Sequence, residues 1–178
     1  MHRVRSVLFV LFAVFGQLVG AAQIIELPRG KEFPLTIDYS RSVEGLIVAG
    51  KFKIGHPSIT SVNFPETNGT GIWRTSVRVV CLEQRLGTDQ ISQGLKAHGQ
   101  RPARLKELLM FAIAYPDEQH HHRIVALGSL MLDDRNGMDM YAPYLSEYGV
   151  WHMLDLYWVG YGGWGNDWCV LAVPANIP

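Results

Sequence analysis

The order of apolar and polar positions along the chain predicts one short helix and two main helices. The short helix covers residues 40–50, where Ser40 or Ser42 can cap the first turn. The first main helix covers residues 88–98, with Thr88 as a capping residue and apolar residues four positions apart. This spacing gathers the apolar side chains of each segment on one face, as in helices that cover a core.

The second main helix is the most strongly patterned segment of the chain and covers residues 104–114. Its apolar stripe is formed by Leu105, Leu108, Leu109, Ala112 and Ile113. Pro116 follows the segment and ends the helix, because proline lacks the backbone N–H that a further turn needs. We therefore expect residues 88–98 and 104–114 to be the two main helices.

Strand patterns occupy the stretches between and after these helices. Residues 72–82 alternate in polarity, with Trp73, Thr75, Val77, Val79 and Cys81 on one face and Arg74, Ser76 and Arg78 on the other. Short apolar runs at 124–130, 154–159 and 168–173 predict three further strands. Residues 134–137 end in Asn-Gly, which is typical of a hairpin turn.

Two main helices and strands of this kind predict an α+β domain with a small, mostly antiparallel sheet. Residues 23–178 show no repeat of fixed period and no boundary to a second domain, so we expect a single domain there.

Residues 1–22 have the composition of a secretory signal peptide. Arg3 and Arg5 precede an apolar run, and small residues suited to cleavage follow it. The apolar run is short for a spanning helix, which needs about 20 residues, although an uncleaved anchor is the alternative. We therefore expect a secreted or cell-surface protein with no membrane insertion after signal cleavage.

Aromatic residues are concentrated near the end of the chain. Nine tyrosines and tryptophans lie between Tyr141 and Trp168, interleaved with glycine, asparagine and aspartate. A core favours Leu, Ile, Val and Phe, whereas binding loops combine rings with small polar residues, because a ring offers contact area with few torsions to freeze. This composition indicates a binding surface, although we expect some rings, above all Trp158, to be buried.

The balance of charge argues against a nucleic-acid partner. Arg3 and Arg5 are two of the 16 basic residues, which leaves 14 basic against 16 acidic residues beyond the leader. No lysine or arginine follows Arg135, so the aromatic segment has no basic stripe to bind a phosphate backbone.

The two cysteines, Cys81 and Cys169, leave two alternatives open. An exported chain meets oxidising conditions in which they can pair, but the sequence does not tell whether their Cα atoms come within reach. Two cysteines are too few for a disulfide scaffold or a structural zinc site.

Neither a metal site nor a catalytic site is indicated by the remaining residues. His120, His121 and His122 are adjacent outside a helix, so they do not project to one point, and we expect an exposed connection there. Asn166 and Asp167 offer oxygen ligands, but calcium needs six to eight oxygens and no partner segment supplies them. No nucleophile stands in a recognisable arrangement with a base and an orienting acid. We expect no cofactor.

Six blocks of the sequence resemble an uncharacterised bacterial family that has a C-type-lectin-like fold. The blocks are Pro34–Ser40, Val62–Pro65, Arg101–Leu109, Ile124–Ser129, Leu154–Trp158 and Val170–Val173. The resemblance covers residues 34–173 and implies a C-type-lectin-like α+β domain. The chain departs from the family at Arg104, where the family has a threonine able to cap the helix, and at Cys169-Val170, where it has Arg-Phe.

The resemblance also extends to the variable proteins of diversity-generating retroelements. In such systems, copying errors at adenines turn asparagine-type codons into codons for Tyr, Asp, His, Ser, Gly and Cys. Asparagine and these residues are frequent here: Ser146, Tyr148, Gly149, His152, Tyr161, Gly162, Gly163, Asn166, Asp167 and Cys169. The alternative is that these are ordinary loop residues.

These observations lead to one expected function and two alternatives. We expect an exported protein that binds a protein or glycan ligand through its aromatic and glycine-rich segment. The expected binding residues are Tyr148, Trp151, His152, Tyr157, Tyr161, Trp164, Asn166, Asp167 and Trp168. The alternatives are a metal-dependent enzyme on the same fold, through His120–His122 or Asp167, and a structural surface protein that self-associates.

Overall fold

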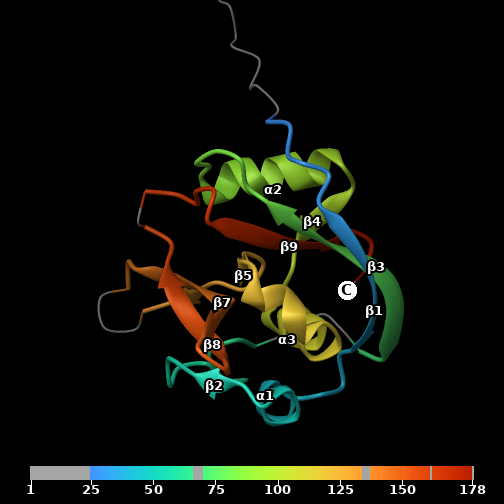
Figure 1. Ribbon diagram of the computed structural model, residues 1–178, viewed down its shortest axis with the longest axis vertical. Helices are drawn as coiled ribbons and strands as arrows, with labels where there is room; N and C mark the ends of the chain where they lie inside the picture. The colour runs from blue at the N-terminus through green and yellow to red at the C-terminus, as the bar shows by residue number, and fades with distance from the viewer. Residues whose placement is uncertain (1–24, 66–69, 134–136, 161, 178) are drawn as a thin grey trace, which may run out of the picture.

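The computed structural model describes residues 25–65, 70–133, 137–160 and 162–177, in which a nine-stranded sheet is covered by three α-helices and a short 3-10 helix, η1 (Figure 1). The strands are β1 (Lys31–Asp38), β2 (Lys53–Ile54), β3 (Ile72–Cys81), β4 (Gln100–Pro102), β5 (Arg123–Val125), β6 (Met131–Leu132), β7 (Met140–Tyr148), β8 (Trp151–Trp158) and β9 (Trp168–Pro174). The helices are α1 (Val43–Gly50), α2 (Thr88–Ala97), α3 (Leu105–Ala114) and η1 (Pro116–His120). The expectation of an α+β domain is confirmed.

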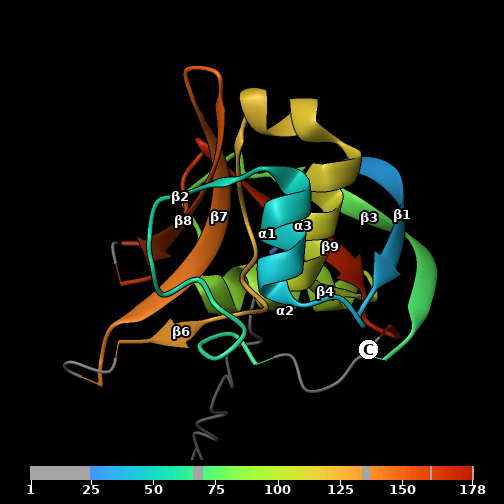
Figure 2. The ribbon, with the colours of Figure 1, turned by 90° about the horizontal axis from the view of Figure 1, so that it is seen from below.

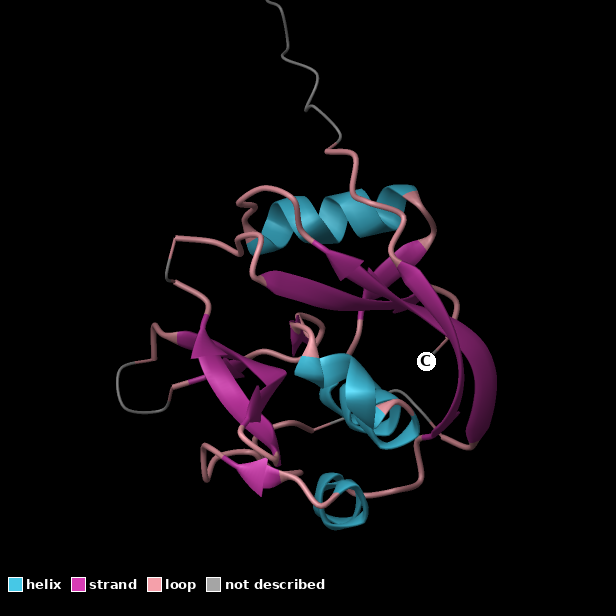
Figure 3. Ribbon diagram, viewed as in Figure 1, coloured by secondary structure: helices cyan, strands magenta, loops and turns pink. Residues whose placement is uncertain are grey.

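The sheet is curved, and its strands run in the order β1-β3-β9-β5-β7-β8-β2, with β4 beside β9 and β6 beside β7. Most neighbours are antiparallel; β5 with β9 and β2 with β8 are parallel. Figure 3 shows α3 in the hollow of the sheet, between the β1–β3 side and the β7–β8 side, whereas α2 covers the outer face along β9. With nine strands, the sheet is larger than the small sheet that the sequence predicted.

Strand β9 lies at the centre of the fold, and both of its faces are buried. Cys169, Leu171 and Val173 join the core around α3, and Trp168, Val170 and Ala172 join a second core beneath α2. A strand covered on both faces reads as a continuous apolar run, which is the pattern that predicted it. The strand expected at 124–130 is shorter: only β5 forms, and its chain then turns at Gly128, where a Cβ would lie 2.6 Å from the Pro102 carbonyl oxygen.

The helix starts agree only in part with the expected caps. Ser42 caps α1, and its Oγ accepts from the backbone N–H of Gly45 at 3.0 Å. The prediction of a threonine cap on α2 is wrong: Gly87 occupies the N-cap, and the Thr88 hydroxyl accepts from Trp164 Nε1 instead. Helix α3 begins without a side-chain cap at Arg104, as its departure from the family pattern implies.

A buried polar network compensates for the missing cap of α3. The carboxylate of Glu107, which is fully buried, accepts from the backbone N–H of Arg104 at 2.6 Å and from two guanidinium nitrogens of Arg101 at 2.7 and 3.0 Å. The hydroxyl of Tyr39 also donates to it. Burial raises the pKa of Tyr39, and its hydrogen bond to Glu107 raises it further. This network ties the end of β1 and strand β4 to the start of α3.

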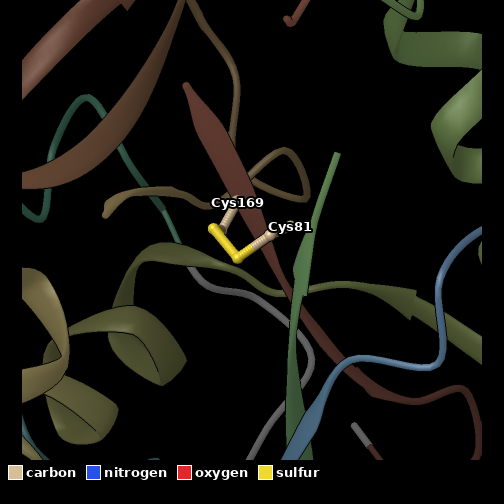
Figure 4. The surroundings of a disulfide bond; sticks show 2 residues. All are labelled: Cys81 and Cys169. Carbon is tan, nitrogen blue, oxygen red and sulfur yellow. A yellow bond between two sulfur atoms is a disulfide. The ribbon is translucent and has the colours of Figure 1, made fainter. Parts of the chain in front are cut away.

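Cys81 and Cys169 form a disulfide between β3 and β9, where they are opposite each other in the register (Figure 4). Of the two alternatives for the cysteines, the structure therefore has the bridge. The signal-peptide prediction for residues 1–22 and most of the expected turn at 134–137 lie outside the described residues.

Candidate functional site

The aromatic segment divides into rings that build the core and rings that face solvent. Trp164 and Trp168 are 1% and 3% exposed, and Tyr144 and Tyr157 are half-buried beside them. Tyr148, Trp151 and Trp158, by contrast, are 74%, 53% and 38% exposed. The aromatic residues of the segment thus have two roles: some build the core, and others form part of the surface.

The buried rings pack edge to face beneath α2. Trp164 and Trp168 have centroids 4.9 Å apart at 85°, and Tyr157 lies 4.6 Å from Trp168. Trp164 Nε1 donates to Thr88 Oγ1 at 3.0 Å, and the Trp164 backbone exchanges two hydrogen bonds with Leu86. The expectation that Trp164 and Trp168 are exposed binding anchors is therefore wrong, because both are held in the core.

The hairpin of β7 and β8 carries the most exposed rings. Tyr148 and Trp151 are paired across its end, and Gly149 and Val150 form the two-residue turn between them. Gly149 has a φ of +62°, and glycine is the residue that a type II′ hairpin turn requires at its first central position. Val150 is 83% exposed, and Lys53 Nζ lies 5.4 Å from the Trp151 ring centroid. We call residues 148–151 the hairpin tip.

A polar cleft of about 460 Å³ lies beside the hairpin tip. Figure 2 shows why: the hairpin and η1 project side by side at the same end of the molecule. Three chain segments line the cleft, namely the end of η1 with the start of β5, the end of β7 with its turn, and the loop before β9. The lining residues are Gln119, His120, His121, His122, Arg123, Ser146, Glu147, Gly149, Asn166 and Asp167.

Polar contacts between these segments hold the cleft together. His120 Nδ1 lies 2.8 Å from a carboxylate oxygen of Glu147, and the rings of His120 and His152 meet edge to face at 5.2 Å. The amide of buried Gln119 contacts His152 Nδ1, while its Oε1 has no hydrogen-bond partner among the described residues. Arg123 forms an ion pair at 3.5 Å with the exposed carboxylate of Asp167, which lies in the loop before β9.

An apolar groove of about 360 Å³ lies at the other side of the hairpin tip. The ends of α1 and α3 form its floor, and the tip forms its wall. Its lining residues are Ala49, Gly50, Lys51, Ala112, Ile113, Pro116, Val150, Trp151 and His152. The tip therefore stands between a polar concavity and an apolar one, and His152 contributes to the groove while touching Gln119 in the cleft.

The structure brings together some of the expected binding residues and separates others. Tyr148, Trp151 and His152 lie at or beside the hairpin tip, and Asn166 and Asp167 line the adjoining cleft. Trp164, Trp168 and half-buried Tyr157 belong to the second core, and Tyr161 lies outside the described residues. The expected burial of Trp158 is wrong: this ring is 38% exposed and belongs to neither core.

Gln119, His120 and Glu147 were not expected at the site. His120 ends a 3-10 helix that begins at Pro116, and this turn brings its ring against β7. The histidine run alone carried no signal of this contact, because Glu147 comes close only through the tertiary fold. The sequence could have linked Glu147 to the site through its cross-strand pairing with His152, but that pairing can be predicted only when the register of the hairpin is known.

One cluster in the described part of the chain has the ligand atoms for a metal ion. Cys81, His122 and Cys169 offer ligand atoms that all lie within 4.8 Å of one another. His120 and its partners around the cleft do not form such a group among the described residues.

No protein-family model matches the chain, and neither a curated protein nor a solved structure matches it. Of the helices in the ranges that the structure describes, none is long and apolar enough to cross a membrane. The function is therefore inferred from the residues of the site itself.

Proposed function

We propose that the chain is an exported ligand-binding protein, and that its binding surface consists of the hairpin tip and the polar cleft beside it. The observation that carries the proposal is the exposure of Tyr148, Val150 and Trp151 together at the end of a two-stranded ribbon. Large apolar side chains gathered on a surface are typical of contact sites. Tyrosine and tryptophan are enriched among the residues that dominate binding energy.

The polar cleft beside the exposed rings supplies hydrogen-bonding and charged groups. The cleft presents amide, carboxylate, imidazole and guanidinium groups, which can distinguish one polar ligand from another. The β7–β8 ladder pairs eight residues on each side, so the tip stands on regular hydrogen-bonded structure rather than on a long loop. Apolar anchors beside directional polar groups suit a protein or a glycan ligand, since both combine apolar faces with hydrogen-bonding groups.

The finer parts of the proposal rest on the sequence. Its C-type-lectin-like character is supported by the six sequence blocks, and the agreement with the structure extends to an α+β domain with a mostly antiparallel sheet. Export is supported by the composition of residues 1–22.

Diversification by a retroelement is supported by where the relevant residue types lie. Ser146, Asn166 and Asp167 line the cleft, where substitution changes the surface without disturbing the core. Gly149 also lines the cleft, but its φ of +62° favours glycine, so we expect that position to vary less. Cys169 is buried in the disulfide, so we expect that position to be constant. Sequencing of the surrounding DNA tests this: a near-copy differing at adenines, beside a reverse-transcriptase gene, supports diversification, and absence of both contradicts it.

The binding surface is tested by screening the protein against a glycan array and a displayed peptide library. The tip variants Tyr148→Ala and Trp151→Ala are then compared with Trp73→Ala, which removes another exposed tryptophan on β3, outside the hairpin. We expect each tip variant to weaken binding of the selected ligand at least about tenfold, which corresponds to about 1.4 kcal/mol. Trp73→Ala should bind as the wild type does. Equal affinity of all three variants contradicts the proposed surface.

Self-association is the second candidate, because the same exposed tip can pack against another copy of the chain. Light scattering over a range of protein concentrations distinguishes the two functions. A dimer that dissociates in Trp151→Ala and persists in Trp73→Ala identifies the tip as a contact between copies. A monomer at all concentrations leaves ligand binding as the function of the tip.

A further inference from the structure

The disulfide has a third residue beside it that the pairing of the cysteines does not use. Cys169 is 1% exposed, Cys81 is half-buried, and His122 is exposed at the mouth of the same corner. The ligand atoms of the three side chains, two sulfurs and an imidazole nitrogen, lie within 4.8 Å of one another. Two cysteines alone are too few for a zinc site, but the histidine completes a set of three ligands.

Three neighbouring strands fix the positions of these residues. Cys81 on β3 is opposite Cys169 on β9, and β5 runs parallel to β9 on its other side, with Ile124 opposite Cys169. His122 immediately precedes β5, so its backbone is held beside the first residues of β9. Ligands carried by paired strands are placed more accurately than ligands on loops. The corner is therefore organised before any ion arrives.

We propose that reduction of the disulfide turns this corner into a zinc site, with the thiolates of Cys81 and Cys169 and the imidazole of His122 as three ligands. Thiolate and imidazole are the ligands that zinc prefers, and three protein ligands leave the fourth tetrahedral position open. Zinc–sulfur and zinc–nitrogen bond lengths place tetrahedral donors roughly 3.5–3.8 Å apart. The exposed His122 side chain can make the remaining approach of about 1 Å by rotating, and the two sulfurs, which are bonded to each other in the disulfide, move apart to this spacing once the bond is broken.

The two states of the corner exclude each other because they use the same sulfurs. A dithiol or a phosphine with water supplies two electrons and two protons, which break the S–S bond and leave two thiols, and the reductant is oxidised to a disulfide or a phosphine oxide. Zinc then replaces the two thiol protons, which pass to solvent. The redox state of the pair thus decides whether the ion binds.

His122 also lines the polar cleft, so an ion held by its imidazole would lie at the edge of the cleft and would take water or a small anion as its fourth ligand. The site shares His122 with the polar cleft but no side chain with the hairpin tip. The variants Tyr148→Ala and Trp151→Ala, which test ligand binding, therefore leave all three proposed zinc ligands in place.

The test uses the full chain, reduced anaerobically with a phosphine and titrated with Co²⁺ as a spectroscopic substitute for zinc. We expect one Co²⁺ per chain, a thiolate-to-cobalt charge-transfer band in the near ultraviolet, visible bands typical of tetrahedral geometry, and loss of all bands when zinc is added. The oxidised chain should give no such bands.

Matched variants decide whether His122 is a ligand. His122→Ala should lower the Co²⁺ affinity of the reduced chain at least tenfold and alter the visible bands, because water replaces a protein ligand. His121→Ala removes the neighbouring exposed histidine, whose ring centroid is 6.3 Å from that of His122, and should bind Co²⁺ as the wild type does. Circular dichroism of each reduced variant monitors the fold.

Three results would overturn the proposal: equal Co²⁺ affinity of the two histidine variants, charge-transfer bands in the oxidised chain, or no thiolate bands in the reduced wild type. If reduction unfolds the chain, zinc should restore the fold of the wild type and of His121→Ala. Failure of zinc to refold them, or equal refolding of His122→Ala, would also overturn it.

Discussion

Replacement of Trp164 should destabilise the domain far more than replacement of the exposed Trp151. Trp164→Ala removes a ring that is 1% exposed, packs against Tyr157 and Trp168 at centroid distances of 5.4 and 4.9 Å, and donates a hydrogen bond to Thr88. Large-to-small changes of this kind lower the free energy of unfolding by about 3–5 kcal/mol. At about 2–4 °C per kcal/mol for a domain of this size, Tm falls by roughly 6–20 °C.

Trp151→Ala is the matched control, because it deletes the same side chain from the hairpin tip. Trp151 is 53% exposed and loses a cation–π contact with Lys53 and surface packing in the apolar groove, so we expect a change below about 1 kcal/mol. Unfolding by urea, followed by far-ultraviolet circular dichroism, measures both variants without relying on tryptophan fluorescence.

A double-mutant cycle isolates the hydrogen bond from the packing. Trp164→Phe keeps an aromatic ring but no donor, and Thr88→Val keeps the shape of the acceptor side chain but no oxygen. We expect a coupling energy of about 0.5–1.5 kcal/mol between the two positions. If Trp164→Ala and Trp151→Ala lower stability equally, the assignment of Trp164 to the core is refuted, and Trp164 returns to the candidates for the binding surface.

Four further predictions concern the scaffold. Glu107→Ala should lower the unfolding free energy in urea by about 3–5 kcal/mol, because it removes the buried carboxylate from its ion pair with Arg101; a loss below 1 kcal/mol contradicts this. The pKa of Tyr39 is raised above its ordinary value of 10.0, so its contribution to stability is present below pH 10 and is lost as pH rises through the folded-state value. In thermal melts from pH 9 upward, Tyr39→Phe should therefore lose less stability than the wild type does. Gly163→Ala should cost more than about 1 kcal/mol in urea, since φ is +88° and the new Cβ would lie 2.7 Å from the Leu86 carbonyl oxygen; wild-type stability would refute the close approach. Cys81→Ser opens a bridge between residues 88 positions apart and should cost about 2–5 kcal/mol by chain entropy, measured against the oxidised wild type; no change in the urea midpoint contradicts it.

The sequence predicted elements whose signal is local and missed those that depend on pairing. The main helices were found within two residues of their bounds because their apolar spacing is a property of the segment itself. Strands β1 and β7 were missed as strands, and each contains a proline, Pro34 and Pro143, which weakens a strand pattern read in isolation. Their place in the sheet depends on partners far away in the chain.

The candidate site shows the same limit in a different form. Composition correctly marked the segment around residues 141–168 as unusual, but it does not separate a ring beneath α2 from a ring at a hairpin end. Trp164 and Trp151 have the same side chain, and only the loop that folds Trp164 back against Leu86 makes one of them core. Likewise, the pairing of His120 with Glu147 joins residues 27 positions apart through η1 and β7.

The central position of β9 has a consequence for the order in which the chain can fold during its synthesis. β9 is the last strand of the described chain, yet it is the strand that joins β3 to β5 and receives β4. A ribosome that has released residues 25–160 has delivered both halves of the sheet without the strand between them, and neither core has its complete set of side chains. Long-range pairing of this kind folds slowly, because the ends of long loops must meet first. The two halves of the sheet are therefore not joined through β9 until Trp168–Pro174 is available.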